Sequence, residues 1–281
     1  MSSSSGFGFL VNDDLPSRDD IIAICSKAGE CRGILLRNQP GEPIAWVKCG
    51  PNVTIDEALT QDWVARSLEA TLDGTVRVPR VYDAFSVPTT SWTIGFIVME
   101  YIDAPDCTEK NVKRVAQAVQ ALISVRGPSS APGHVCGGPV IHSFFIDDWT
   151  SPFRYETVDE LEQHINGILR VGDNPKRVSL VTDASDGLYL CPCDINPRNF
   201  KKLPDGKVVA LDFRASCFLP PSFFAVTMAK AMDHFIIKVA RHVKYPISGD
   251  VAVMTSASYS LVPYGRNDIG APKSLRRRKE L

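Results

Sequence analysis

The sequence contains no run of about 18 or more apolar residues, which is the length that a membrane-spanning helix requires. Its first ten residues also lack a basic region followed by a long apolar stretch, the pattern of a secretory signal. We therefore expect a cytoplasmic protein with no membrane partner. No internal repeat is visible either, so the chain does not read as a repeat array.

An excess of charge of either sign is absent as well. Lys and Arg number 31 and Asp and Glu number 32, giving a formal net charge of −1. A protein that binds nucleic acid or an anionic surface through its overall field needs a clear positive excess. We therefore expect no nucleic-acid partner, and specificity must come from local groups. The sequence leaves the oligomeric state unknown.

The 8 cysteines form no disulfide framework or zinc-binding pattern. Cys191 and Cys193 stand close together, but no second pair follows at zinc-like spacing, so we expect reduced thiols in the core. With 281 residues, of which 44% are hydrophobic and 22% charged, the composition is that of a globular protein. This length suits one large domain or two lobes that share a cleft.

The first hundred residues alternate short apolar runs with Gly and Pro turns. After a flexible arm over 1–20, the pattern predicts strands at 21–25, 33–36, 44–49, 76–82 and 95–101. A capping box at Thr54 and apolar residues at four-residue spacing (Val64, Leu68, Leu72) predict one helix among these strands. Residues 21–102 thus read as a small antiparallel sheet with a single helix, and a polar link at 103–106 marks the boundary to a second lobe over 103–281.

The second lobe is predicted to be mainly helical, which makes the fold class α+β. Helical periodicity is clear over 112–123, from a second capping box at Thr157 through Ile168, and over 228–239. Between the first two of these helices lies a Gly- and Pro-rich stretch, 127–152, with aromatic residues Phe144, Phe145 and Trp149. Such a long stretch without a regular pattern is typical of a functional loop.

Residues 188–216 read as strand, polar loop and hairpin. The turn signal at 204–206 predicts that 200–203 pair antiparallel with 208–211. This pairing makes Asn199 and Asp212 neighbours, and Asp194 stands across the same loop. Carboxylate and amide oxygens are hard ligands that suit Mg²⁺. The segment therefore predicts a magnesium site at the mouth of the hairpin.

The same segment resembles a known family. Asp194-Ile-Asn-Pro-Arg-Asn199, followed by Leu211-Asp212-Phe213, is similar to the catalytic loop and metal motif of the protein-kinase-like fold. The closest resemblance is to the aminoglycoside phosphotransferase-like family, and the wider context resembles its fungal members. Ile44-Ala-Trp-Val-Lys48 and Val98-Met-Glu-Tyr-Ile102 resemble the family's nucleotide strand and hinge, in the family's order. The resemblance implies a two-lobed fold.

The resemblance also implies roles for individual residues. ATP and Mg²⁺ would be the cofactors, with Lys48 on the nucleotide phosphates and Glu57 as the partner of that lysine. Backbone groups near Glu100 and Ile102 would bind adenine, and the backbone over 28–33 would cover the phosphates. In the later motif Asn199 and Asp212 would hold Mg²⁺, and Asp194 would be the catalytic residue that orients the acceptor.

Each of these residues also has a simpler reading. Glu57 is explained by its capping box alone, and Lys48 in isolation reads as a strand lysine that points to water. Asp194 and Asn199 read equally as loop residues bonded to their own backbone. Asp212 is the exception, because an acid directly after the apolar run 208–211 needs a partner.

Two positions depart from the family's pattern: Pro192 stands where its loop has His, and Arg214 where many kinases have Gly. The leading hypothesis is an ATP- and Mg²⁺-dependent phosphotransferase for a small-molecule hydroxyl or amine, bound beside the aromatic residues of 144–149. A pseudokinase-like protein that binds a nucleotide or another ligand, and a pocket repurposed for a non-phosphoryl reaction of fungal-type secondary metabolism, stay open. The basic run 276–279 reads as a solvated terminus or as a contact for an anionic partner.

Overall fold

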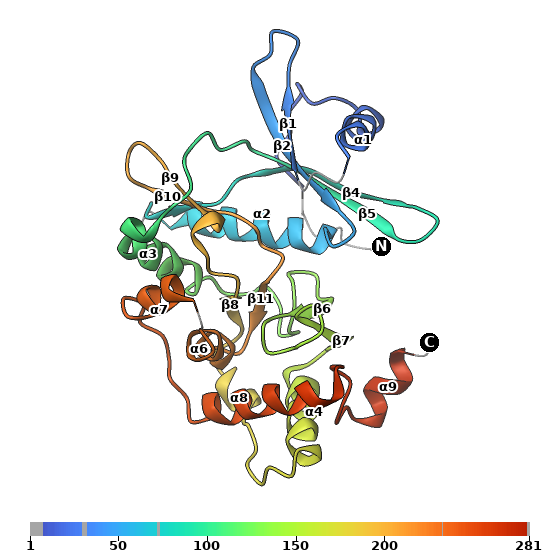
Figure 1. Ribbon diagram of the computed structural model, residues 1–281, viewed down its shortest axis with the longest axis vertical. Helices are drawn as coiled ribbons and strands as arrows, with labels where there is room; N and C mark the ends of the chain where they lie inside the picture. Colours follow the sequence, from blue (N-terminus) through green and yellow to red (C-terminus); the bar gives the residue numbers. More distant parts are fainter. Residues whose placement is uncertain (1–7, 30–32, 72–73, 232, 280–281) are drawn as a thin grey trace.

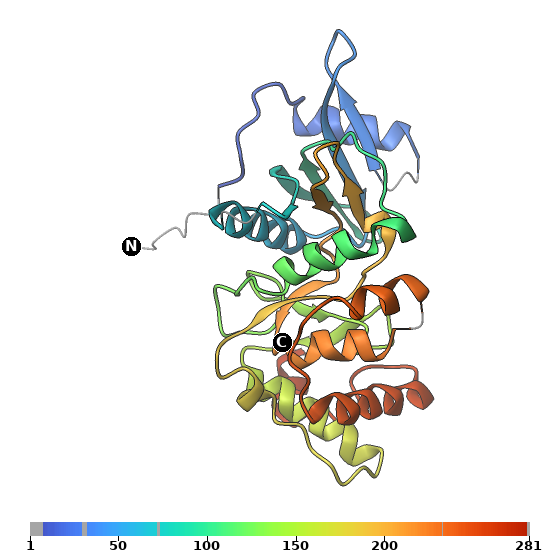
Figure 2. The ribbon, with the colours of Figure 1, turned by 90° about the vertical axis from the view of Figure 1, so that its left-hand side faces the viewer.

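Two halves of different composition lie one above the other (Figure 1). The structure is a computed structural model that describes residues 8–29, 33–71, 74–231 and 233–279. The upper half holds a mainly antiparallel sheet, whereas helices dominate the lower half, as the view at 90° also shows (Figure 2). The predicted α+β class, with a sheet lobe followed by a mainly helical lobe, is confirmed.

The upper sheet has the strand order β1-β2-β5-β4, and all three pairings are antiparallel. Its strands are β1 (Gly33–Arg37), β2 (Pro43–Gly50), β4 (Val81–Pro88) and β5 (Thr93–Met99). Successive residues of a strand point to opposite faces of the sheet. Ala45 and Val47 of β2 accordingly join one buried cluster, whereas Trp46 packs on the other side. Lys48 has the same parity as Trp46 and faces the side that helix α2 (Ile55–Ala70) covers.

The expected strand at 21–25 is wrong, because this segment lies in helix α1 (Arg18–Lys27). Ser17 caps the helix by accepting a hydrogen bond from the Asp20 N–H, and acidic residues occupy its first turn. The buried residues Ile21 and Cys25 are four apart, which places them on one helical face against the sheet. The described residues of the upper half therefore form two helices, α1 and α2, rather than the single one expected.

A second sheet joins segments from both sides of the expected boundary at residue 103. Strand β3 (Val76–Arg77) pairs in parallel with β10 (Val208–Ala210), which pairs antiparallel with β9 (Phe200–Lys202). The predicted hairpin is thus confirmed, with Phe200 opposite Ala210 and Lys202 opposite Val208. Because this sheet and α2 share the largest buried cluster with the lower half, the hairpin is fixed against the upper half.

The lower half is built from short strands and helices around that cluster. The predicted helices at 112–123 and from Thr157 are α3 (Val112–Leu122) and α4 (Val158–Val171). The single helix expected over 228–239 is two helices, α6 (Ser222–Ala229) and α7 (His234–Ala240); Asp233 starts the second by accepting from the Phe235 N–H. Met232 lies outside the described residues. The other elements are β6 (Pro139–Ile141), β7 (Thr150–Arg154), α5 (Leu180–Asp183), β8 (Tyr189–Pro192), β11 (Ser216–Leu219), α8 (Asp250–Leu261) and α9 (Lys273–Lys279).

Within the described ranges, no helix combines the length and apolar character that crossing a membrane demands.

Candidate active site

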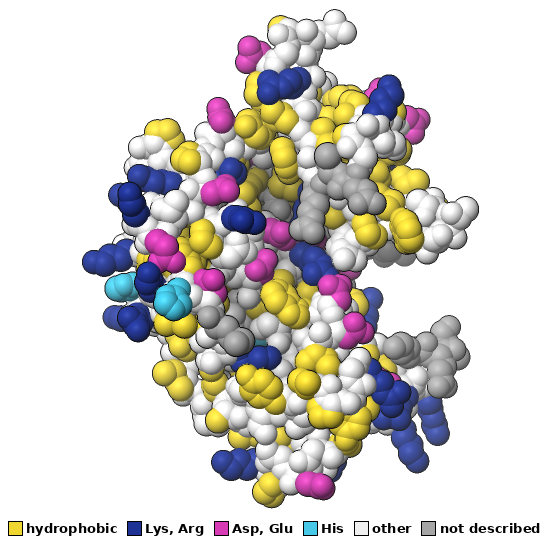
Figure 3. Space-filling model, viewed as in Figure 1, with side chains coloured by type: hydrophobic (Ala, Val, Ile, Leu, Met, Phe, Trp, Pro, Cys, Tyr) yellow, Lys and Arg dark blue, Asp and Glu magenta, His cyan; other side chains and the backbone are white. Residues whose placement is uncertain are grey.

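The charged groups singled out in the sequence meet where the two halves of the molecule join. Lys48 comes from β2, Glu57 from the first turn of α2, and Asp212 from the segment that directly follows β10. The surface is hollowed between the two halves, and side chains of both charge signs gather there (Figure 3). Three elements that are distant in sequence therefore converge on one cleft.

Lys48 is bound by both carboxylates. Its Nζ lies 2.5 Å from Oε1 of Glu57 and 2.9 Å from Oδ1 of Asp212. The Glu57 side chain is 1% exposed, that of Lys48 20% and that of Asp212 41%. The lysine thus does not point to water, and its ammonium group links a buried carboxylate to an accessible one.

The cap of α2 places Glu57. Thr54 Oγ1 accepts a hydrogen bond from the Glu57 N–H at 3.1 Å, so the N-cap half of the predicted box is present. The Glu57 carboxylate, however, binds Lys48. Its second oxygen, Oε2, is buried and has no hydrogen-bond partner among the described residues. Capping alone therefore does not account for Glu57.

Asp212 has a strained backbone, with a φ of 57° in the left-handed region. Asp tolerates this conformation better than most residues because its short side chain bonds nearby backbone groups. Here Oδ1 also accepts from the Arg214 N–H at 3.4 Å. The turn directs the Asp212 carboxylate toward Lys48 as soon as the strand ends.

Burial and neighbouring charges shift the pKa values of Lys48 and Glu57 in opposite directions. Burial alone would lower the pKa of Lys48, but the carboxylates of Glu57 and Asp212 outweigh it and hold the pKa above its usual value. Burial raises the pKa of Glu57, and the neighbouring Lys48 charge opposes the shift. A protonated lysine, bound by both carboxylates, is therefore favoured at neutral pH.

Asp194 and Asn199 lie in the loop between β8 and β9. Asn199 Nδ2 donates to Asp194 Oδ2 at 3.0 Å and to the Asp194 carbonyl at 2.9 Å, and Asn196 Nδ2 donates to Asp194 Oδ1 at 3.0 Å. The loop reading of these residues is therefore correct in part. These bonds also fix the Asp194 carboxylate. None of them uses the amide oxygen of Asn199. The Leu211 N–H donates to the Asn199 carbonyl at 2.8 Å, which places Asn199 beside the residue that precedes Asp212.

The oxygen donors fit a magnesium ion that arrives with phosphates. Asp212 offers one accessible carboxylate and Asn199 one amide oxygen, and Mg²⁺ commonly binds through one or two carboxylates plus phosphate oxygens and water. Among the described residues, no group of three or more His, Cys, Asp and Glu side chains is placed to hold a metal by itself. The donor set therefore suits a nucleotide-bound ion better than a permanent structural one.

At the predicted hinge, Glu100 and Ile102 follow the end of β5. The Glu100 side chain is turned toward β3, where it forms an ion pair with Arg77. The Glu100 N–H donates to the Arg80 carbonyl at 2.9 Å, and the Ile102 carbonyl accepts from the Ala104 N–H at 3.1 Å. Neither bond uses the Glu100 carbonyl or the Ile102 N–H, so both remain candidates for the adenine contact.

Two further expectations concern the segment that covers the phosphates and the site of the acceptor. The stretch expected to cover the phosphates, 28–33, lies outside the described residues over 30–32. The acceptor was expected beside Phe144 and Phe145, but both rings are 0% exposed and belong to the core, so they cannot line a site. Apolar aromatic rings and a Gly-rich stretch do not by themselves distinguish a binding loop from a buried one. Trp149 is the exposed ring of this group, at 37%.

The structure places Arg214 and Pro192 beside the motif. Arg214 forms an ion pair with Asp148, so its guanidinium ties the stretch before β7 to the residues after Asp212. Asp148 and Trp149 both have a positive φ, at 45° and 56°. Pro192 ends β8 opposite Ser216 of β11. The arginine therefore braces the motif from the side, a contact that the resemblance to the family did not predict.

His134 is a residue near the site that sequence reasoning missed. Its ring is 3% exposed, and Nδ1 lies 3.1 Å from Oγ1 of Thr60, one turn after Glu57 on α2. Burial lowers the pKa of His134 to about 4; the Arg214 backbone opposes the shift, and the Arg214 and Lys48 charges reinforce it. A neutral imidazole thus packs between α2 and the Asp212 segment. Its position in a Gly-rich stretch carried no signal for this placement.

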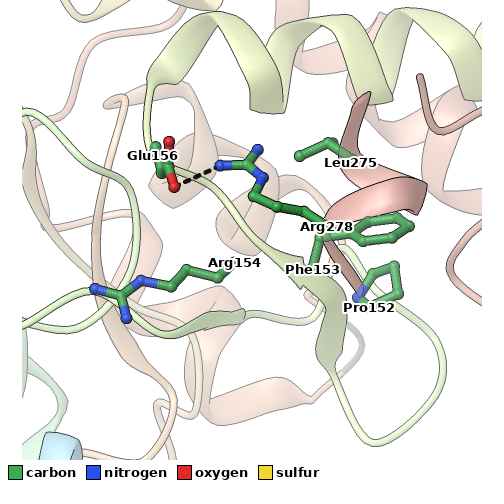
Figure 4. Close-up of a pocket in the computed structure, with 6 residues that line it drawn as sticks. All are labelled: Pro152, Phe153, Arg154, Glu156, Leu275 and Arg278. Atoms are coloured by element: carbon green, nitrogen blue, oxygen red, sulfur yellow. Dashed lines mark ion pairs between the residues drawn. The ribbon is translucent and has the colours of Figure 1, made fainter. Parts of the chain in front are cut away.

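A separate pocket lies between β7 and the C-terminal helix α9, with a volume of about 300 Å³ (Figure 4). Arg278 Nη1 lies 2.7 Å from Oε1 of Glu156, and Arg278 also pairs with Glu160 at the start of α4. Leu275 is buried beside them. Arg278 of the basic run 276–279 is therefore held against the protein within α9, whereas Arg276 and Arg277 are exposed, as a solvated run predicts. None of the residues that line this pocket belongs to the Lys48 cluster.

No family model and no curated protein matches the chain. Solved structures share a similar course of the chain at low identity. A macrolide 2'-phosphotransferase from Brachybacterium faecium is 13% identical, with a TM-score of 0.41 over 88% of this chain and 91% of that one. An aminoglycoside phosphotransferase from Alicyclobacillus acidocaldarius is 12% identical, with a TM-score of 0.41 over 90% and 91%. A choline kinase from Streptococcus pneumoniae is 13% identical, with a TM-score of 0.38 over 88% and 90%. Because these TM-scores lie below 0.5, the case for the site rests on its own geometry.

Proposed function

We propose that this protein is an ATP- and Mg²⁺-dependent phosphotransferase that acts on a hydroxyl or amine of a small molecule. The observation that carries the proposal is the position of Lys48 between Glu57 and Asp212, at 2.5 Å and 2.9 Å, in the cleft between the two halves. Phosphoryl transfer depends mainly on positioning and on neutralising phosphate charge. A fixed cation beside an accessible carboxylate supplies both.

In this proposal Lys48 binds the α- and β-phosphates, and Glu57 keeps its side chain aimed at them. The buried Glu57 carboxylate has no competing partner in the described chain other than this lysine, so the pair is oriented before the nucleotide arrives. Asp212 and Asn199 would hold Mg²⁺, which neutralises the charge on the phosphate oxygens when it is bound. Asp212 would then exchange part of its contact with Lys48 for the ion.

Asp194 would orient the acceptor. Its carboxylate is fixed by amide hydrogens of Asn196 and Asn199, so it presents its remaining lone pairs in one direction. A carboxylate is too weak a base to deprotonate an alcohol in the ground state. Asp194 would therefore accept the proton late, as the acceptor oxygen or nitrogen bonds to phosphorus and the γ-phosphoryl group leaves ADP.

The adenine ring would lie against the segment after β5. The Glu100 carbonyl accepts and the Ile102 N–H donates, a pair that matches the edge of adenine. The Glu100 side chain is engaged by Arg77, so only its backbone takes part. This contact positions the nucleotide without adding charge to the cleft.

The ion pair between Arg214 and Asp148 favours a second candidate, a protein that binds the nucleotide without transferring phosphate. This pair connects the residues after Asp212 to the stretch that carries Trp149, and it restrains the side of the cleft where the acceptor would enter. Nucleotide binding would persist in such a protein, but no product would form.

Transfer of label from γ-labelled ATP to a panel of small hydroxyl and amine compounds, and to an extract of the host, separates the two candidates. We expect a labelled product with the wild-type protein and none with Asp194→Asn, while stabilisation by ATP and Mg²⁺ is the same for both. Asp186→Asn, which changes an exposed carboxylate, serves as the matched control and keeps full transfer. Nucleotide stabilisation without any product supports the second candidate, and full transfer by Asp194→Asn contradicts the role of Asp194.

A further inference from the structure

A second hollow lies on the lower half, between the start of α3 and the end of α7. It has a volume of about 480 Å³ and is lined by residues of both helices and of the 3-10 turn Glu109–Asn111 that leads into α3. Lys, Arg and His side chains gather at this edge of the molecule, where α3 and α7 lie in Figure 1 (Figure 3). The lining residues are Glu109, Lys110, Val112, Lys113, Arg114, Lys238, Arg241 and His242. No residue of the Lys48 cluster lines it.

The charge of this hollow is far from that of the whole chain. Five Lys and Arg side chains and one Glu line it, a local charge of +4 in a protein whose formal net charge is −1. The single carboxylate, Glu109, is already engaged, because its Oε2 lies 2.6 Å from Nζ of Lys238. Within the described part of the chain, Lys110, Lys113 and Arg241 form no ion pair. Several cations therefore share one small space without counter-charges from the protein.

Helix dipoles explain only two of these five cations. Lys238 and Arg241 lie at the end of α7, where positive charge stabilises a helix. Lys110, Lys113 and Arg114 lie at the opposite pole, in the 3-10 turn and the first turn of α3, where positive charge is unfavourable. Their placement costs stability in the free protein. An anion bound in the hollow would offset that cost.

Two of the cations are held in place. Arg114 Nη1 donates to the Gly206 carbonyl at 2.7 Å, in the turn of the β9–β10 hairpin, and Lys238 is held by Glu109. Fixed cations lose less conformational entropy when they bind a ligand than free ones do. Lys110, Lys113 and Arg241, which form no ion pair with the described residues, supply the remaining positive charge of the lining.

We propose that this hollow binds a small, multiply charged phosphate anion. Its charge matches an anion with several negative groups, and its volume confines a compact ligand. The near-neutral charge of the chain offers no extended basic track for a polymer. The proposal does not depend on the function assigned to the Lys48 cleft.

Calorimetric titration with inorganic tripolyphosphate tests the site. We expect saturable binding by the wild-type protein that weakens as salt increases, and at least about tenfold weaker binding by Lys113→Glu/Arg241→Glu, which removes the local excess of charge. These two residues form no ion pair in the described chain, so their reversal breaks none of its ion pairs. Arg170→Glu/Lys176→Glu makes the same change of net charge at exposed positions elsewhere and should keep wild-type affinity.

The cleft between the two halves is the competing phosphate site. Lys48→Met/Glu57→Leu, which removes its fixed cation, should keep tripolyphosphate binding at the hollow. Loss of binding in that variant, equal weakening in the Arg170 and Lys176 control, or no binding by the wild type each overturns the proposal. Tighter binding of a single-stranded RNA than of tripolyphosphate, with the same dependence on Lys113 and Arg241, also overturns it, because the surface would then serve a nucleic acid.

Discussion

The ammonium group of Lys48 forms ion pairs with two carboxylates of different exposure. Glu57 is buried and satisfies only one of its oxygens, whereas Asp212 is open to the cleft. Removing one partner of a buried ion pair leaves the other charge without compensation, which costs more than the pair itself contributes. The structural and the functional roles of Lys48 can therefore be measured separately.

We expect Lys48→Met to lower the free energy of unfolding by about 3 kcal/mol, because the Glu57 carboxylate stays buried without its partner. Lys48→Met/Glu57→Leu should recover most of this loss, since both charges are then gone. Neither variant should transfer phosphate. Urea unfolding and the label-transfer assay check the two parts. A double variant that is less stable than Lys48→Met would show that the pair is not what stabilises this region.

Single residues were predictable from the sequence only through their joint pattern. Lys48 alone reads as a surface lysine, and only its contacts with Glu57 and Asp212 show otherwise. The neighbourhood of Asn199 and Asp212 followed from counting along a hairpin, because a tight turn fixes its register. His134 and Arg214 were not predictable in this way, since their partners Thr60 and Asp148 lie more than 60 residues away.

Among the elements, helix α2 connects local sequence to the cleft. Its N-cap, Thr54, holds the first turn from which Glu57 reaches Lys48. Fraying of this turn would release Glu57 without changing any charged residue. The helix start is thus a positioning device as well as a stabilising one.

Thr54→Ala should lower the free energy of unfolding by about 1 kcal/mol, because the Glu57 N–H loses its acceptor. Thr54→Ser, which keeps a hydroxyl, should remain near the wild type. Thr157→Ala removes the equivalent cap of α4 and serves as the matched control. We expect both alanine variants to lose similar stability in urea unfolding, but only Thr54→Ala to weaken ATP binding. Equal ATP affinity in the two would argue against a link from the cap to the cleft.

Elements with a strong periodic pattern were predicted well. Helices α3 and α4 lie where their apolar spacing placed them, because one face packs on the core. The segment at 21–25 was misread as a strand, since five apolar residues in a row do not distinguish the two states and the i, i+4 pair Ile21 and Cys25 decides only in context. The break between α6 and α7 depends on Asp233 acting as an N-cap within an otherwise helical run.

On the scale of the whole molecule, buried neutral histidines make stability depend on pH. His164 is fully buried: Nδ1 lies 2.6 Å from the Tyr155 hydroxyl, and Nε2 lies 3.1 Å from the Ile269 carbonyl. Burial lowers its pKa to about 4, while hydrogen bonds to the backbone oppose the shift. In the unfolded chain the ring regains a pKa near 6.5.

The unfolded chain therefore takes up a proton at His164 between pH 6.5 and 4 that the folded protein does not. The resulting stability is present above pH 6.5 and is lost as the pH falls through this window, by up to about 1.4 kcal/mol per pH unit. We expect His164→Gln to lose less stability than the wild type between pH 7.5 and 5.5 in urea unfolding. The carboxylates whose pKa burial raises are common to both proteins, so their opposite effect cancels in the comparison. If the free energy of unfolding of His164→Gln changed with pH as it does in the wild type, His164 would not be the group that titrates.

The two halves of the molecule meet at a cleft whose charged groups come from β2, α2 and the second residue after β10, and the central claim is that this cleft binds ATP together with Mg²⁺. Thermal unfolding of the wild type and of Asp212→Asn, with a non-hydrolysable ATP analogue in the presence and absence of Mg²⁺, tests it most directly. Asn keeps the size of the side chain and tolerates the left-handed backbone at this position, but it removes the charge. We predict that the analogue stabilises the wild type more with Mg²⁺ than without, and that this difference disappears in Asp212→Asn. The account would be contradicted if stabilisation by the analogue did not depend on Mg²⁺, or if Asp212→Asn kept the full difference between the two conditions.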